Sequence, residues 1–199
     1  MVADCAEATG QWSEIAFLDD AFPTLAESGG WRVVGTAADL PKMLNRYDAC
    51  VVAFGNCRAR VQMIERARQA GFAIPSIVHP TAVVSKRARI HAGAQLLAGS
   101  IVNCGSEIGP GCIVNTAATI DHDCKLDSGV HVCPGAHLAG DVHIGARTWF
   151  GIGAVARQGI RIGADVTVGA GAVCVTNIRD GVTVMGVPAR ERERRNDDV

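Results

Sequence analysis

The sequence predicts an α/β N-terminal unit with a small parallel sheet, followed by a left-handed parallel β-helix. Three observations lead to this expectation. Residues 1–79 alternate between helical and strand-like segments, and a hydrophobic repeat of six residues runs from Val84 to Val168 without insertion or loss. Apolar residues make up 48% of the chain although aromatic residues make up only 5%, so the core must consist of many similar layers of aliphatic side chains.

The first 79 residues are expected to alternate between helices and strands, as in a small parallel sheet. The stretch VADCAEATG is typical of a helix that ends at a glycine. Strands are predicted at SEIAFLDD, WRVV, DACVVAFGN and IPSIVHP, and the third of them runs into a Gly-Asn turn. A short helix is predicted at AADLPKML, and CRARVQMIERARQAG has helical periodicity with a terminal glycine.

The second unit is predicted from residues spaced six apart. Of the fifteen residues met in steps of six from Val84 to Val168, all but Ala156 are large and apolar, and a glycine often follows directly. A period of six does not fit an α-helix, which repeats every 3.6 residues. It fits a triangular prism in which three hexads close one coil. Fifteen hexads would give five coils, about 24 Å tall at roughly 4.8 Å per coil.

Composition and charge exclude several classes of protein. The net charge is −1 with both signs mixed, which does not favour a surface for nucleic acid. No apolar run approaches the roughly 20 residues that a membrane-spanning helix needs. The eight cysteines include no C-x-x-C motif, and no signal peptide precedes them, which indicates reduced thiols. We therefore expect a cytoplasmic protein without membrane insertion.

Three motifs follow one another in the predicted prism: NTAATIDHDC at residues 115–124, HVCPGAHLAGDVHIG at residues 131–145, and GVPAR at residues 186–190. With this order of units, the chain resembles the hexapeptide-repeat sugar acetyltransferases of the sialic acid O-acetyltransferase type. These include the N-acetyltransferases of UDP- or GDP-linked 4-amino sugars in bacillosamine and perosamine synthesis. The resemblance covers nearly the whole chain, although GVPAR marks only the broader superfamily.

The resemblance implies acetyl-CoA as acyl donor, a nucleotide-linked sugar as acceptor, a homotrimer and no metal. It also implies that three parts of the chain have different roles. Residues 1–79 would form a unit like a nucleotide-sugar-binding domain, residues 80–187 the acetyltransferase domain, and residues 188–199 a charged C-terminal tail.

His122 and Asp123 occupy the place of the family's catalytic pair. Imidazole titrates near neutral pH, so it can take the proton that an attacking amine loses. A neighbouring carboxylate would fix the tautomer and favour the imidazolium. The repeat places His122 two positions after an inward residue, on an outer face or corner. The alternative is a solvated histidine among surface acids. Some family members carry Glu at the place of Asp123.

Gly140 lies eighteen residues after His122, one coil later at the same position of the hexad, so it is expected to stack near His122. The resemblance favours its backbone N–H as the donor to the developing oxyanion, and as a contact of the acyl donor. The alternative is a glycine that only turns a corner, and the two are compatible.

Further contacts rest on the resemblance. His131 would touch the substrate or the cofactor, and Asn115 the substrate, whereas His137 and His143 are expected at the surface. Nucleotide contacts would come from Asp19, Asp20, Gly55 and Asn56, for which turn chemistry at strand ends is the alternative. Contacts with CoA would come from Gly151, Gly169 and Arg190, where the repeat itself also explains the glycines.

The chain departs from the family at its start. Relatives begin with a strand and a Gly-rich loop with a histidine, which helps to hold the phosphates. Here the sequence starts with MVADCAEATG, already inside the first predicted helix. The N-terminal sheet is therefore expected to lack its first strand and this loop, and to expose an edge.

Several functions remain open at this stage. N-acetylation of a nucleotide-linked amino sugar is the leading one, and O-acetylation of sialic acid or a related sugar is the close alternative. A zinc carbonic anhydrase of the same prism fold is disfavoured, because no two histidines have the H-x4-H spacing. A non-catalytic trimeric scaffold would be consistent with the missing loop.

Overall fold

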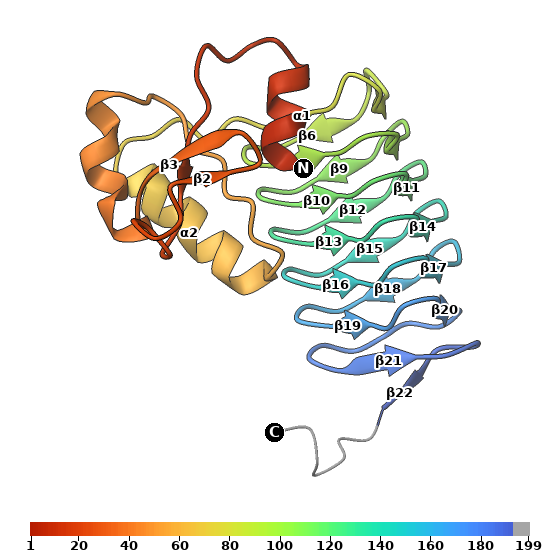
Figure 1. Cartoon of the computed structure of the whole chain (residues 1–199). Helices are drawn as coiled ribbons and strands as arrows, with labels where there is room; N and C mark the ends of the chain where they lie inside the picture. The colour runs from red at the N-terminus through yellow and green to blue at the C-terminus, as the bar shows by residue number, and fades with distance from the viewer. Residues whose placement is uncertain (193–199) are drawn as a thin grey trace.

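The computed structural model describes residues 1–192, which form a small N-terminal unit beside a tall prism of short strands (Figure 1). The N-terminal unit contains α1 (Val2–Ala8), β1 (Phe17–Leu18), β2 (Glu27–Ser28), β3 (Trp31–Gly35), the 3-10 helix η1 (Ala37–Asn45) and α2 (Cys57–Gln69). The prism contains β4 (Ile77–Val78), β5 (Val83–Val84), β6 (Arg89–Ile90), β7 (Gln95–Leu96), β8 (Ile101–Val102), β9 (Glu107–Ile108), β10 (Ile113–Val114), β11 (Thr119–Ile120), β12 (Lys125–Leu126), β13 (His131–Val132), β14 (His137–Leu138), β15 (His143–Ile144), β16 (Trp149–Phe150), β17 (Val155–Ala156), β18 (Arg161–Ile162), β19 (Thr167–Val168), β20 (Val173–Cys174), β21 (Thr183–Met185) and β22 (Arg190–Glu191).

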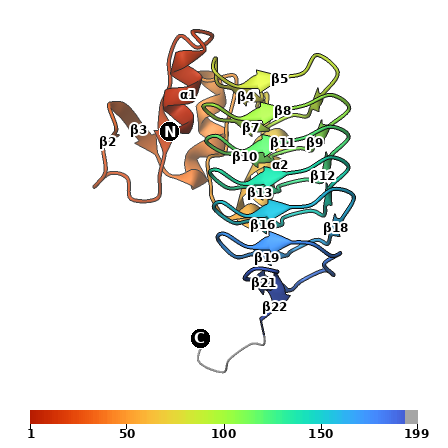
Figure 2. The ribbon, with the colours of Figure 1, turned by 90° about the vertical axis from the view of Figure 1, so that its right-hand side faces the viewer.

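The prism consists of three parallel sheets, as the hexad repeat predicts. Each two-residue strand pairs with the strands one coil before and after it, so that Ile113 lies between Gln95 and His131. The second residue of each strand points inward, and these side chains form one continuous aliphatic core from Leu96 to Val184. The left-handed parallel β-helix is therefore confirmed, and Figure 2 shows one of its sheets from β4 to β21.

The corners of the prism require a left-handed backbone. One residue per hexad has a positive φ, and glycine supplies most of these positions, because it adopts this conformation without strain. Asp123 and Asp141 are among the exceptions, with φ of 58° and 56°. Aspartate tolerates this region better than most residues, but a short side chain there still costs more than glycine.

The prism is longer at both ends than the run from Val84 to Val168. The stretch IPSIVHP was predicted as the last strand of the N-terminal sheet, and that assignment is wrong. Its strand β4 pairs with β7 of the prism, because Val78 stands one hexad before Val84 and carries the same inward spacing. At the other end β20 continues the hexad, and β22 turns back to pair antiparallel with β21. Of the predicted charged tail, residues 193–199 lie outside the described part of the chain.

The N-terminal unit keeps the predicted helices but only part of the predicted sheet. The helices α1 and α2 are confirmed, and Asn56 caps α2 by accepting a hydrogen bond from the Ala59 N–H (2.9 Å). The segment AADLPKML forms the 3-10 helix η1 rather than an α-helix. β1 and β3 pair in parallel, while β2, which was not expected, pairs antiparallel with β3. The expected strand in DACVVAFGN contributes only a bridge between Ala49 and Ala73.

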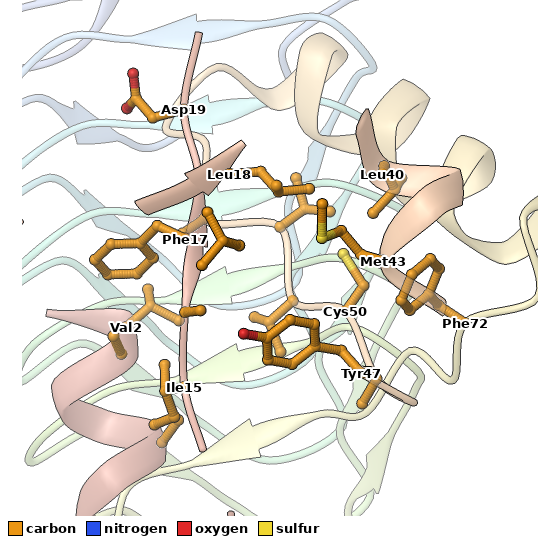
Figure 3. A pocket seen from close by; sticks show the side chains of 18 of the residues that line it. Val2, Ile15, Phe17, Leu18, Asp19, Leu40, Met43, Tyr47, Cys50 and Phe72 are labelled. Atoms are coloured by element: carbon orange, nitrogen blue, oxygen red, sulfur yellow. The ribbon is translucent and has the colours of Figure 1, made fainter. Parts of the chain in front are cut away.

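A partly open pocket of about 430 Å³ lies in the N-terminal unit, between β1 and residues 50–54 (Figure 3). Apolar side chains such as Phe17, Leu40 and Phe72 line it, and Asp19 stands at its margin. Among residues 1–192, the backbone N–H groups of Val51, Val52 and Ala53 find no acceptor. This segment has apolar neighbours and an extended sequence pattern, but it pairs with no strand along this stretch.

No helix within residues 1–192 is both long and apolar enough to cross a bilayer. All eight cysteines are free thiols.

Candidate active site

His122 stands at the corner between β11 and β12, where the hexad predicted an outer position. Its side chain is 57% exposed, and its Nδ1 lies 2.9 Å from Oδ2 of Asp123. The left-handed backbone at Asp123 turns its carboxylate back towards the preceding residue. Two consecutive residues of one corner therefore form a histidine–carboxylate pair, with Nε2 left over for another partner.

A buried serine braces this corner from inside. Ser106 Oγ donates to the carbonyl of Asp121 (2.6 Å) and accepts from the Cys124 N–H (3.0 Å). The Asp121 carboxylate accepts from the His122 N–H (2.9 Å) and from Asn103 Nδ2 (3.1 Å). Both ends of the turn are thereby fixed, which limits the positions that the imidazole can reach.

Two glycines leave space for the pair in the neighbouring coils. A methyl group on Gly140 would lie 2.5 Å from Cε1 and Nε2 of His122, and one on Gly105 would collide with the Asp123 carboxylate. Real side chains do not make contacts this close, so neither glycine can carry a Cβ without a shift of its neighbour. The His122 ring therefore lies directly against the backbone of Gly140. The expected stacking of Gly140 on His122 is therefore present in the structure.

The backbone of Gly140 offers an unused donor. Its carbonyl accepts from the Gly159 N–H and the following Asp141 N–H donates to the His122 carbonyl, but among residues 1–192 its own N–H donates to no group. An N–H group beside the imidazole is suited to hold an oxyanion that forms within reach of the base.

Acidic neighbours control the charge of His122. The hydrogen bond with Asp123 raises the pKa of His122 above its ordinary value, and the charges of Asp121 and Asp141 act in the same direction. Partial burial opposes them. The raised pKa makes the ring a stronger base, and its protonated form is stabilised in place.

The pH dependence of catalysis should report this coupling. Only neutral His122 can accept a proton, so kcat/KM is expected to rise with pH through the raised pKa of His122. Asp123→Asn replaces the carboxylate that bonds to His122 with a neutral amide, so the pKa of His122 should fall. The acidic limb of the kcat/KM profile should then move to lower pH, and its plateau should fall because the imidazolium is less stabilised. The measurement is kcat/KM between about pH 5 and 9 at constant ionic strength. A limb that does not move in Asp123→Asn would show that another group controls it.

Asn115 and His131 form a second, buried pair. Asn115 Nδ2 lies 3.0 Å from His131 Nε2, while Asn115 Oδ1 accepts from the Thr116 N–H (2.8 Å). The amide orientation is thus fixed, so Nε2 of His131 must be the acceptor and Nδ1 carries the proton. Burial lowers the pKa of His131 to about 4, and the charge of Arg60 acts in the same direction. This histidine is therefore neutral at physiological pH.

One chain does not bring the two pairs together. His122 lies at the corner between β11 and β12, whereas His131 lies in β13 on the sheet that the N-terminal unit covers. His137 and His143 lie in β14 and β15, on the other two sheets. His137 borders a hollow beside the His122 corner, together with Asn103, Thr119 and Asp121. His137 Nδ1 lies 2.9 Å from Thr119 Oγ1.

Both aspartates among the expected nucleotide contacts accept backbone hydrogen bonds, one within a turn and one at the start of η1. Asp19 Oδ1 accepts from the Ala21 N–H (2.9 Å), and Asp20 Oδ1 accepts from the Ala37 N–H (3.0 Å). Gly55 precedes the cap residue Asn56 at the start of α2. All four lie in the N-terminal unit, and the last two adjoin the sheet that carries His131.

The expected CoA contacts lie in the last coils. A methyl group on Gly151 would collide with the carbonyl of Val168, and one on Gly169 would lie 3.0 Å from Cβ of Met185, so coil stacking alone requires a small residue at both positions. Arg190 lies in β22 and its guanidinium donates to the Ala189 carbonyl (2.9 Å).

Sequence reasoning overlooked Ser106, Gly105 and Asp121. Ser106 had the appearance of a small filler of the repeat, but its hydroxyl is the brace of the corner. Gly105 could have been found by the spacing that identified Gly140, because it lies eighteen residues before Asp123. Within residues 1–192, no three His, Cys, Asp or Glu side chains gather in a way that would hold a metal ion.

Comparison with known proteins gives consistent matches. The family model of the PglD N-terminal domain matches residues 1–67. The acetyltransferase domain of PglB from Neisseria gonorrhoeae FA1090, solved with acetyl coenzyme A, is 46% identical and has a TM-score of 0.92, over 96% of this chain and 92% of that chain. No curated protein matched in a search by sequence.

Two further solved structures are similar along nearly their whole length. A histidine-to-alanine mutant of GDP-perosamine N-acetyl transferase from Caulobacter crescentus, in complex with CoA and GDP-perosamine, is 36% identical, with a TM-score of 0.91 over 97% of this chain and 91% of that chain. WeeI from Acinetobacter baumannii AYE is 25% identical, with a TM-score of 0.87 over 96% of this chain and 94% of that chain.

Proposed function

Because the chain belongs to the hexapeptide-repeat acetyltransferases of nucleotide-linked amino sugars, we propose that it acetylates the amino group of a UDP- or GDP-linked 4-amino sugar with His122 as general base. The observation that carries this role is the His122–Asp123 pair, whose ring lies against the backbone of Gly140, a residue whose N–H donates to no group among residues 1–192. A base and an oxyanion donor side by side are what acyl transfer from a thioester needs.

The proposed reaction is a direct transfer. The sugar amine attacks the thioester carbonyl of acetyl-CoA, and Nε2 of His122 takes the proton that the amine loses. Asp123 accepts from Nδ1–H and stabilises the imidazolium, while the N–H of Gly140 donates to the oxyanion. The C–S bond then breaks, and the imidazolium returns its proton to the leaving thiolate of CoA. The products are the acetamido sugar and free CoA.

The remaining contacts extend this proposal along the chain. Residues 1–79 would hold the nucleotide through Asp19, Asp20, Gly55 and Asn56, and Asn115 with His131 would face the sugar. The last coils would hold CoA through Gly151, Gly169 and Arg190. The free thiols support a reducing compartment, and hence a cytoplasmic enzyme.

An acetyl-transfer assay with mass detection tests the acceptor class. Acetyl-CoA is offered with UDP-, GDP- and dTDP-linked amino sugars and with free sialic acid, because thiol reagents would react with the protein's own cysteines. We expect acetylation of a UDP- or GDP-linked 4-amino sugar, and none with His122→Ala. Acetylated sialic acid would identify an O-acetyltransferase instead. A folded protein that acetylates no acceptor would favour a trimeric scaffold.

We further propose that the enzyme is a homotrimer with its active sites between chains. One reason is that His122 and the Asn115–His131 pair lie on different edges of the prism. A second reason is a contrast between two outer faces. The sheet that carries β11 presents no Lys, Arg, Asp or Glu at its outward strand positions, which suits packing against another copy; these residues are Val83, Ile101, Thr119, His137, Val155 and Val173. The sheet that carries β12 presents Arg89, Glu107, Lys125, His143 and Arg161.

Mixed trimers test this arrangement. His122→Ala and Asn115→Ala chains are each expected to be nearly inactive alone. After co-expression, about a quarter of the sites in random trimers should combine an intact His122 with an intact Asn115 from another chain. Activity should therefore reappear in the mixture. No recovery from a mixture whose trimers are verified by native mass spectrometry would show that each chain supplies a whole site.

A further inference from the structure

Arg60 is a fully buried cation at the junction of the two parts of the molecule. It belongs to the first turns of α2, and its relative exposure is 0%. Its Nε donates to the Gly111 carbonyl and its Nη2 to the Gly129 carbonyl, each at 2.8 Å. Its Nη1 donates to the carbonyls of Phe54 (2.6 Å) and Gly55 (3.2 Å). One guanidinium thus connects two stacked corners of the prism to the turn before α2.

Among residues 1–192, the charge of Arg60 has no acidic partner. Its acceptors are all backbone carbonyls, and none of the ion pairs among residues 1–192 includes it. Burial of a guanidinium without a carboxylate is costly, so an arginine at this place needs a reason beyond packing. A second tie already holds the same segment, since Gln95 Nε2 donates to the Val52 carbonyl (2.7 Å).

The positive charge of Arg60 is close enough to His131 to lower the pKa of that histidine, in addition to the larger effect of burial. Its proton-bearing Nδ1 is buried without a hydrogen-bond partner among the described residues. The Gly55 carbonyl is close enough to raise the pKa of His131, yet remains outside hydrogen-bond geometry, and Arg60 already donates to that carbonyl. The other titratable groups around Arg60 are the thiols of Cys57, Cys112 and Cys133, and burial raises the pKa of Cys112 and of Cys133 to about 12, so both stay neutral.

We propose that Arg60 is a positioning residue for the acceptor side of the active site, which holds the Gly55 turn against the prism and disfavours a positive charge on His131, the partner of Asn115. A protonated His131 would lose the acceptor at Nε2, and the fixed amide of Asn115 would then face a second donor. The role in turnover rests on the proposed function, whereas the electrostatic coupling of Arg60 to His131 does not.

The test compares Arg60→Met, which removes the charge, with Arg60→Lys, which keeps the charge but loses the planar fork. In Arg60→Met the pKa of His131, followed by NMR with labelled histidine, is expected to rise by about one unit or more. The value of kcat/KM for the acceptor sugar is expected to fall about tenfold. In Arg60→Lys, kcat/KM should fall while the pKa of His131 stays low. Arg58→Met is the matched control, because this exposed arginine of the same helix pairs with Asp165 at the surface, and both readouts should match wild type.

Two results would overturn the proposal. One is a folded Arg60→Met protein in which His131 titrates as in wild type, which would remove the electrostatic coupling. The other is an Arg60→Lys protein with unchanged kcat/KM, which would remove the positioning role and decides the matter if Arg60→Met does not fold. Should every acceptor remain unacetylated by wild type, the NMR titration still tests the coupling, so failure of the proposed function is recognised separately.

Discussion

His122→Ala is expected to lower kcat/KM by about 10²- to 10⁴-fold, the usual contribution of a positioned general base. The loss should appear mainly in kcat, because the ring takes part in proton transfer rather than in holding either substrate. Steady-state kinetics with the best acceptor from the panel measure it. The fold should survive, since the side chain is exposed and the corner is braced by Ser106 instead.

His91→Ala provides a matched control for this substitution. His91 also pairs with a carboxylate on the prism surface, with Nε2 2.8 Å from Oε1 of Glu107, but it stands apart from the His122 corner. Its loss should leave kcat/KM unchanged. Equal activity of His122→Ala and His91→Ala would reduce His122 to one more surface histidine with an acidic neighbour.

Gly140→Ala is expected to reduce kcat by about 10²-fold, through a single methyl group. The backbone at Gly140 is not left-handed, so alanine fits the chain itself. The methyl group would lie 2.5 Å from the imidazole and must push the ring away, and with it the alignment of base and oxyanion donor. Steady-state kinetics of the single variant measure the loss, and thermal unfolding verifies that the protein remains folded.

A double-mutant comparison separates displacement of the ring from other damage. Once His122 is alanine, Gly140→Ala has no ring to displace, so its further effect on the residual rate should be much smaller than in wild type. The same fold loss in both backgrounds would mean that Gly140 acts independently of His122.

The repeat made the prism and its corner predictable, because each hexad obeys the same local rule. The corner position of His122 follows from its place in the hexad. The stacking of Gly140 on it follows from the eighteen residues that make one coil. Failures occurred where non-local contacts decide. Val78 stands six residues before Val84, but a single hexad step does not separate a prism strand from a buried strand of the N-terminal sheet, and the pairing with β7 decides. Arg60 is one of several arginines in CRARVQMIERARQAG, and no local signal distinguishes the buried one from its exposed neighbours.

The pairing of Asn115 with His131 was missed for a related reason. Both residues were identified, but their hydrogen bond joins adjacent coils, sixteen residues apart along the chain. The direction of a side chain at a corner depends on its hydrogen-bond partners, and here the Thr116 N–H donates to Asn115 Oδ1 and so orients the amide. The hexad spacing predicts which coil a residue belongs to. It does not predict the charge state of His131, which depends on burial beneath the N-terminal unit.

The prism and the segment at residues 50–54 beside the pocket differ in how completely their backbone is hydrogen-bonded. In the prism each inner strand is bonded to a strand on both sides, whereas the N–H groups of Val51, Val52 and Ala53, which border the pocket, are unpaired among residues 1–192. The same three amides should exchange with deuterium early, despite their apolar surroundings. Any segment that paired with them would stiffen the unit that carries the proposed nucleotide contacts.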